Sequence, residues 1–130
     1  MKVRKGSRIA LVAGSTLALM AGISGSGHAA EIRGTIATIN VAGGSGTFLD
    51  GGDRVECYDT RKDGYGIRTY AYSPKGGETW VQYASCLGGK GDLQQSGNAG
   101  FVEGHRVKLR VCYVKRNMDV KCSRYKYATA

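Results

Sequence analysis

Apolar and polar side chains alternate most clearly between residues 106 and 114. Val107, Leu109 and Val111 share one parity, and basic residues occupy most positions of the other. Alternation of this kind is typical of a strand that buries one face and exposes the other. We therefore expect a strand over residues 106–114, with its apolar side on a core and its cationic side in water.

Short runs of β-favouring residues recur after residue 30, between clusters of Gly, Asp, Ser and Asn, and helix signals are nearly absent. The predicted strands cover residues 32–41, 54–58, 66–72, 79–86, 101–102, 106–114 and 120–129. About seven short strands at these spacings predict an all-β fold, a small antiparallel β-sandwich of immunoglobulin-like architecture. The order Cys57, Trp80, Cys86 differs from that of a true antibody domain, in which the Trp lies closer to the first Cys.

The first predicted strand has apolar residues on both parities. Ile32 and Ile36 share one parity, whereas Ile39 and Val41 share the other. A bulge near residues 37–38 would bring all four to one side and give an ordinary edge strand. The alternative is that both sides are apolar because this segment pairs with a partner chain by strand addition.

The first 29 residues have the order of a secretory signal. Basic residues come first, an apolar run of 15 follows over residues 9–23, and small residues lead to a cleavage site after Ala29. The run is short for a membrane span, although a retained anchor is the alternative. We expect a cleaved signal peptide over residues 1–29 and one secreted, extracellular β domain over residues 30–130, with no membrane insertion after cleavage.

All four cysteines lie after the predicted signal, at Cys57, Cys86, Cys112 and Cys122. An even number in a small exported domain predicts two disulfides. Three pairings are open from the sequence, and we favour 57–86 with 112–122. The closely spaced cysteine pairs of a zinc site are absent, so we predict neither a metal nor a cofactor.

The positive charge is concentrated at the end of the chain. The formal net charge is +9, and residues 104–130 contain eight Lys or Arg and one Asp. If Cys112 and Cys122 lie opposite each other, Leu109 faces Tyr125 and Val107 faces Tyr127 on the core side, while Arg110 faces Arg124 and Lys108 faces Lys126 on the outer side. Like charges in opposite positions are unfavourable by roughly 0.2–1 kcal/mol per pair. They are tolerated either because water and salt screen them or because an anionic partner neutralises them.

The predicted binding face of this hairpin consists of its outward cations: Arg106, Lys108, Arg110, Arg124 and Lys126. The chain also contains eight tyrosines and one tryptophan. These rings either form the core of a small, glycine-rich domain or form a flat aromatic surface beside the basic groups. An exposed surface of that kind suits sugars, single-stranded nucleic acid or a protein partner.

Candidates for catalysis are weak. Glu103 and His105 share a parity at the start of a strand and resemble an acid–base pair only in residue type. Asp59 and Asp63 lie ahead of Gly64 as in a calcium loop, but no Glu closes that loop, so a turn is the better interpretation. We predict no catalytic residue and no enzymatic activity.

Two blocks of the chain carry a resemblance to known proteins. They are "GDRVECYDTRKDGYGIRTYAY" and "GHRVKLRVCYVKRNMDVKCSRYKYATA". Together with the signal they resemble small secreted β-sandwich proteins of actinomycetes, of the Streptomyces type, whose function is largely unassigned. The resemblance implies an extracellular location and a β-sandwich, and it implies no functional residue. Tendamistat-like amylase inhibitors are similar in size and cysteine count, but their Trp-Arg-Tyr motif is missing here.

The expected function is a secreted, non-catalytic binding module. It would act as an adaptor in an extracellular protein assembly or bind an anionic polymer at a cell surface, with nucleic acid as a further candidate. The alternative is a protease inhibitor that presents Lys75 or Lys90 on an exposed loop. A small nuclease or hydrolase that uses Glu103 and His105 is the third hypothesis.

Overall fold

The computed structural model describes residues 36–130. Every regular element in this part of the chain is a strand, and none of it forms a helix able to cross a membrane. The predicted signal peptide and the predicted strand residue Ile32 lie outside the described residues. The all-β prediction is therefore confirmed for the part that the structure describes.

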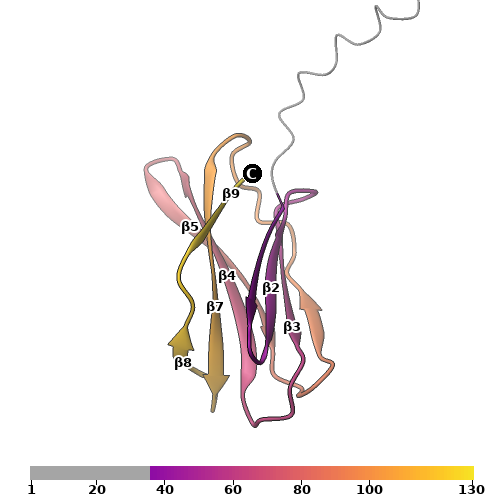
Figure 1. The fold of residues 1–130 in the computed structure, drawn as a ribbon. Coiled ribbons are helices and arrows are strands. Elements are labelled where there is room, and N and C mark those ends of the chain that lie inside the picture. The colour runs from indigo at the N-terminus through magenta and orange to yellow at the C-terminus, as the bar shows by residue number, and fades with distance from the viewer. Residues whose placement is uncertain (1–35) are drawn as a thin grey trace, which may run out of the picture. The chain divides into compact units, whose positions relative to one another are not determined.

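Nine strands form two antiparallel sheets (Figure 1). They are β1 Ala37–Val41, β2 Gly44–Leu49, β3 Arg54–Asp59, β4 Gly66–Lys75, β5 Glu78–Cys86, β6 Leu93–Gln95, β7 Arg106–Lys115, β8 Met118–Cys122 and β9 Lys126–Thr129. One sheet has the order β1-β2-β3-β6, and the other has the order β5-β4-β7-β8, with β9 also paired to β7. The predicted β-sandwich and both favoured disulfides, Cys57–Cys86 and Cys112–Cys122, are confirmed.

The chain crosses between the sheets in an immunoglobulin-like pattern. It passes from β3 to β4 in the opposite sheet, returns to place β6 beside β3, and crosses again to place β7 beside β4. These four strands thus pair as strands B, C, E and F do in immunoglobulin-like sandwiches. The disulfide between the sheets differs, because it joins β3 to β5 rather than B to F.

Strand β2 was not predicted, because its glycines were taken for loop signals. Gly44 and Gly46 are required by close packing between the sheets. A Cβ on Gly46 would lie 2.6 Å from Cγ2 of Thr69, and a Cβ on Gly44 would lie 2.9 Å from Cγ1 of Ile67. Glycine in a strand allows this close approach, so a glycine-rich segment forms the second strand of a sheet.

Two other predicted strands differ in the structure, and one strand was missed. Residues 101–102 are not a strand; Phe101 lies in a loop, and its ring packs 6.2 Å from that of Phe48. The predicted strand over residues 120–129 is divided into β8 and β9. Strand β6 was missed because it has only three residues, all of them exposed.

The first strand contains no bulge. Strand β1 pairs with β2 in one unbroken register from Ala37 to Val41. Ala37 is buried, Ile39 and Val41 pack against the core, and Ile36 is 63% exposed just before the strand begins. The predicted bulge at residues 37–38 is therefore wrong, because Ile36 does not need to face the core.

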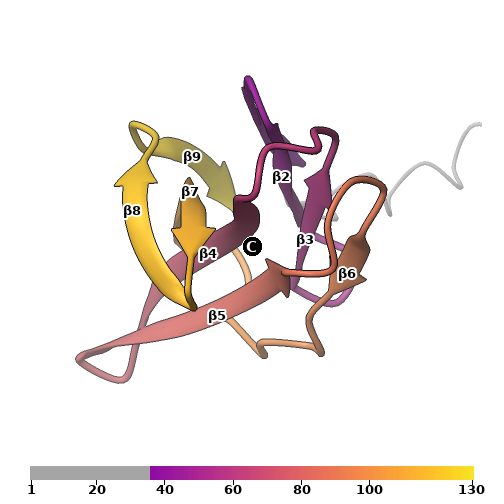
Figure 2. The ribbon, with the colours of Figure 1, turned by 90° about the horizontal axis from the view of Figure 1, so that it is seen from below.

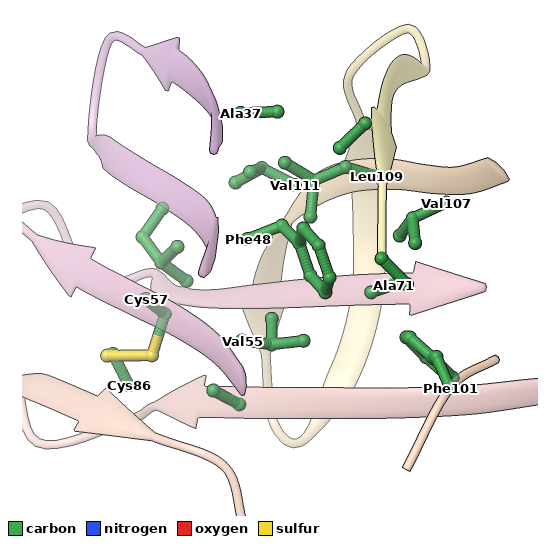
Figure 3. Close-up of a cluster of buried hydrophobic side chains, with 14 residues drawn as sticks. Ala37, Phe48, Val55, Cys57, Ala71, Cys86, Phe101, Val107, Leu109 and Val111 are labelled. Atoms are coloured by element: carbon green, nitrogen blue, oxygen red, sulfur yellow. A yellow bond between two sulfur atoms is a disulfide. The ribbon is translucent and has the colours of Figure 1, made fainter. Parts of the chain in front are cut away.

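The core fills the space between the two sheets (Figure 3). Phe48 lies among Val55, Ala71 and Val111 and is fully buried. Val107, Leu109 and Val111 are buried along β7, as their alternation predicted. Burying a side chain of this size contributes roughly 1.5–3 kcal/mol, which makes this strand central to the stability of the domain.

The two sides of the sandwich are closed differently. On one side the Cys57–Cys86 disulfide joins β3 to β5, and the end of β5 lies close to β3 and β6 (Figure 2). On the other side Lys126 Nζ, from β9, donates a hydrogen bond of 3.0 Å to the carbonyl oxygen of Thr38 on β1. One seam is thus covalent, and the other includes a hydrogen bond from a lysine.

The close packing at Gly46 gives a stability prediction. We expect Gly46→Ala to lower the free energy of unfolding by about 1–3 kcal/mol, because the added methyl group overpacks the space between Thr69 and Val111. Gly51→Ala is the matched control, since nothing lies within 4 Å of a Cβ at that position. Urea denaturation of both variants measures the difference, and equal stabilities would contradict the proposed close approach.

The two disulfides should differ in their contribution. The Cys57–Cys86 loop spans 29 residues and the Cys112–Cys122 loop spans 10. Loop-closure entropy then gives about 3.6 kcal/mol for the first and about 2.7 kcal/mol for the second. We expect urea denaturation to show a larger loss for the double variant Cys57→Ala, Cys86→Ala than for Cys112→Ala, Cys122→Ala. The reverse order would mean that loop closure does not determine the difference.

Candidate binding face

The outer face of the β5-β4-β7-β9 sheet combines tyrosines with cations. Residues of β7 that point outward lie between tyrosines of β4 on one side and tyrosines that accompany β9 on the other. We call this surface the cationic tyrosine face. Its members are Arg68, Tyr70, Tyr72, Tyr83, Arg106, Lys108, Arg110, Tyr125 and Tyr127.

A register shift places these tyrosines outside. Opposite β7, the predicted register holds at the Cys112–Cys122 pair, but β9 is displaced by one residue, so that Leu109 lies opposite Lys126. The shift follows Ser123, whose backbone N–H donates to the carbonyl oxygen of Val111 and whose hydroxyl accepts from the backbone N–H of Val111. Because a one-residue slip moves side chains to the opposite side of a strand, the predicted pairs beyond Ser123 are wrong.

The shift replaces pairs of like charge with contacts between cations and rings. Lys108 lies opposite Tyr127 rather than Lys126. Its Nζ is 4.3 Å from the ring centroid of Tyr125, and Cζ of Arg106 is 3.8 Å from that of Tyr127. A cation on an aromatic ring is stabilised by roughly 0.5–1 kcal/mol at an exposed site, so the tyrosines support the cations instead of filling the core.

Arg110 occupies the middle of the cationic tyrosine face. Its Cζ lies 5.5 Å from the ring centroid of Tyr70, 5.8 Å from that of Tyr72 and 5.6 Å from that of Tyr125. Its Nε is buried and has no hydrogen-bond partner among the described residues. The three rings therefore hold the guanidinium group in place while one of its donors remains unused.

One carboxylate lies beside this surface, that of Asp119 on β8. It forms an ion pair of 3.3 Å with Arg68 Nη1 and accepts a hydrogen bond of 2.6 Å from the hydroxyl of Tyr70. This is the single ion pair among residues 36–130. Arg106, Lys108 and Arg110 consequently have no carboxylate partner in the described part of the chain.

Two shallow depressions lie at the ends of the face. Tyr72, Ser73, Pro74, Thr79, Arg106, Lys108 and Tyr127 line the first. Arg68, Tyr70, Tyr83 and Asn117 line the second. Each depression is lined by tyrosine rings, by cationic side chains and by uncharged side chains that can form hydrogen bonds. The surface between them is open, as a flat sheet face requires.

The remaining predicted binding residues lie elsewhere. Arg124 is exposed in the segment between β8 and β9, and its carbonyl oxygen accepts a hydrogen bond from the Ser123 hydroxyl. Lys126 reaches Thr38 at the seam between the sheets. Of the residues predicted for strand addition, Ile39 and Val41 pack against the core and Ile36 is exposed, while the hydrogen bond from Lys126 occupies a carbonyl on the edge of β1.

The candidate acid–base pair is not arranged along a strand. Glu103 and Gly104 form a turn before β7, and Gly104 has a φ of 78°. Nδ1 of His105 lies 3.1 Å from the carbonyl oxygen of Pro74, where the ring can donate a hydrogen bond to the backbone. The alternation that suggested two adjacent side chains therefore does not apply to Glu103 and His105.

The acidic residues of the loop after β3 stabilise turns. Oδ1 of Asp59 accepts from the backbone N–H of Arg61, and Oδ1 of Asp63 accepts from that of Tyr65. Such contacts are the turn chemistry that the sequence predicted. Asp119 lies within 4.8 Å of the sulfur atoms of Cys112 and Cys122, but these sulfurs are bonded to each other and offer no thiolate ligand.

The two lysines considered for protease inhibition lie in different settings. Lys75 Nζ donates to the carbonyl oxygen of Gly100 and lies 3.9 Å from the ring of Trp80, so its ammonium group is already engaged. Lys90 is exposed between Gly89 and Gly91, which have φ values of 93° and 90°. These left-handed conformations produce a tight turn rather than an extended loop.

No protein-family model, no curated protein and no solved structure matches the chain. The functional interpretation therefore depends on the geometry of the cationic tyrosine face. The sequence contained a signal for that face, because Tyr70 and Tyr72 alternate along β4 in the same way as the cations alternate along β7. What it did not contain was the shift after Ser123, which decides where Tyr125 and Tyr127 lie.

The environment of Tyr70 gives a prediction about pH. Burial, together with the hydrogen bond to Asp119, raises the pKa of Tyr70 above its ordinary value of 10.0, and burial raises the pKa of Tyr72 in the same direction. The folded protein then holds protons that the unfolded chain releases above pH 10. The free energy of unfolding should therefore fall as the pH rises through the folded pKa values.

Absorbance titration of tyrosinate measures the pKa values of the tyrosines. We expect Asp119→Asn to move part of the curve toward lower pH, because the variant removes the negative charge beside the Tyr70 hydroxyl. Glu56→Gln, on the other sheet, is the matched control and should leave the curve unchanged. A curve that Asp119→Asn does not move would show that the carboxylate has no influence on Tyr70.

Proposed function

We propose that the mature chain is a secreted, non-catalytic binding module that binds an anionic partner outside the cell through the cationic tyrosine face. One observation carries the proposal: Arg106, Lys108 and Arg110 lie side by side between two rows of tyrosines and have no carboxylate partner among the described residues. An anionic partner would supply the charge that these three side chains lack.

The arrangement of the cations favours a role in binding a partner over a role in solubility alone. Lysines and arginines that serve only solubility extend freely into water. Here Lys108 and Arg110 are half-buried and are held against rings. Ordering such side chains costs conformational entropy, and the ordering is already done before a partner arrives. A preorganised set of cations is suited to recognising a particular arrangement of negative charge.

Separate observations support the proposed location. Two disulfides are typical of proteins in an oxidising environment. The order of residues at the N-terminus is that of a secretory signal. The resemblance to secreted actinomycete proteins points the same way. We propose that the domain acts outside the cell, on a polymer of the cell surface or as an adaptor in an extracellular assembly.

Salt elution from a heparin column tests the proposal. We expect the mature protein to bind and the double variant Lys108→Glu, Arg110→Glu to elute at much lower salt, because it reverses two of the three unpaired charges. The matched control is Arg54→Glu, Lys90→Glu, which has the same net charge but changes exposed cations outside the face. The milder pair Lys108→Gln, Arg110→Gln, checked by urea denaturation, separates lost binding from lost folding.

The control decides between a specific face and total charge. Elution of the control variant close to the unchanged protein supports binding through the cationic tyrosine face. Equal shifts in both glutamate variants would mean that net charge alone determines retention. That result, or a protein that does not bind the column at all, would overturn the proposed function.

A further inference from the structure

We infer that the ligand of the cationic tyrosine face is a linear acidic polysaccharide, lying along β7 from one depression to the other, with an acidic group of the glycan bound by Arg110. The inference depends on the proposed function and names the chemical class of its ligand. The relevant glycans carry carboxylate, sulfate or phosphate groups, since a guanidinium group recognises all three by the same chemistry.

The shape of the face indicates a polymer. Small molecules are usually bound in concave pockets that bury most of their surface. Here two shallow depressions lie at opposite ends of an open sheet, at Tyr72 and Lys108 on one side and at Arg68 and Tyr83 on the other. The rings of Tyr72 and Tyr70 line one depression each, 6.0 Å apart, and both rings lie beside Arg110, so an extended ligand that occupies both depressions comes close to that guanidinium group.

The spacing of the cations suits a chain with repeated charges. Arg106, Lys108 and Arg110 occupy alternate positions of one strand. With a rise of about 3.4 Å per residue, their Cα atoms are roughly 7 Å apart. Charges that recur along an extended polymer can therefore meet successive cations without the protein changing shape.

The depressions offer the contacts that sugars use. Thr79 lines the first depression together with Tyr72 and Tyr127. Asn117 lines the second with Tyr70 and Tyr83, and its Oδ1 accepts a hydrogen bond of 2.6 Å from Arg68 Nη2. Rings can cover the apolar faces of sugars, while neutral hydroxyl and amide groups donate to and accept from sugar hydroxyls. Acidic groups would meet the cations between these contacts.

Nucleic acid is a poorer fit because cations and neighbouring rings already cover one side of several of these rings. Single-stranded nucleic acid is bound largely by stacking of bases on exposed aromatic faces. Arg106 covers one side of the Tyr127 ring and Lys108 covers one side of the Tyr125 ring, at 3.8 and 4.3 Å. Tyr70 and Tyr72 stack on each other with an interplanar angle of 20°. One side of each of these rings is therefore already occupied.

An acidic protein is also a poorer fit. The centre of a protein interface is usually apolar and depleted in charged residues, with the polar groups at its rim. The cationic tyrosine face has the opposite order, because Lys108 and Arg110 lie at its centre. A hydrated, charged polymer matches such a centre better than the apolar surface of a folded protein.

Arg110 is assigned the central contact because of its surroundings. Three tyrosine rings lie 5.5 to 5.8 Å from its guanidinium carbon, and no carboxylate among residues 36–130 forms an ion pair with it. A fixed guanidinium group can bind an acidic group with two parallel hydrogen bonds, which a lysine cannot do. Arg110→Lys therefore removes the planar donor set while it keeps the charge.

Isothermal titration calorimetry with matched polymers tests the assignment. The mature protein is titrated with polygalacturonate and with its fully methyl-esterified form, and with dextran sulfate and dextran. We expect the charged member of at least one pair to bind at least tenfold more tightly than its neutral counterpart. Arg110→Lys should weaken that binding about tenfold, and Lys90→Arg, an exchange of the same kind outside the face, should leave it unchanged.

Single-stranded oligo-dT and poly-glutamate are titrated in parallel. Binding of either one as tightly as the best acidic glycan, with loss in Lys108→Glu, Arg110→Glu, would overturn the inference while the proposed function survives. Equal binding of charged and neutral glycans, or an Arg110→Lys variant that binds normally, would also overturn it. Failure of every polyanion, heparin included, would overturn both.

Discussion

The backbone offset after Ser123 decides which side chains the outer sheet carries. Side chains alternate along a strand, so one additional residue between β8 and β9 sends everything beyond it to the opposite side. Tyr125 and Tyr127 become surface residues, and the small side chain of Ala128 takes the buried position opposite Val107. The core loses two large rings by this exchange, and the surface gains them.

The same offset resolves a conflict of charge. In an unshifted hairpin, four cations would face one another in two pairs, each of them unfavourable. In the shifted hairpin, the cations of β7 lie between tyrosines, and the lysine at position 126 is drawn to the edge of the other sheet. Repulsion is thereby exchanged for weak attractions and for closure of the sandwich, and the cationic surface becomes an ordered one.

The parts of the fold that follow simple periodicity could be predicted from the sequence. The alternation along β7 predicted its two faces correctly. The cysteine count predicted two disulfides, and of the three possible pairings the favoured one is present. The glycine-rich β2 was missed because the reason for its glycines lies in the opposite sheet, at Thr69 and Ile67. Tertiary contacts of this kind leave no local pattern.

The candidate site was also predicted only in part. The sequence placed Arg106, Lys108 and Arg110 on one outward face, and the structure has them there. It left the tyrosines undecided between core and surface, since both outcomes fit an alternating pattern. The hydroxyl of Ser123 settles the matter. It accepts a hydrogen bond from the backbone N–H of Val111 and donates one to the carbonyl oxygen of Arg124, and the hydrophobic pattern of the sequence reports neither contact.

The two sides at which the sheets meet are joined unequally, so the sheets should separate more easily on one side than on the other. A covalent bond ties β3 to β5, whereas a lysine side chain spans the gap between β1 and β9. Transient separation of the layers therefore resembles a hinged cover, with its hinge at Cys57–Cys86 and its free rim at Thr38. Hydrogen exchange of backbone amides would be fastest along that rim, close to the segment that carries Tyr127, and slowest beside the hinge.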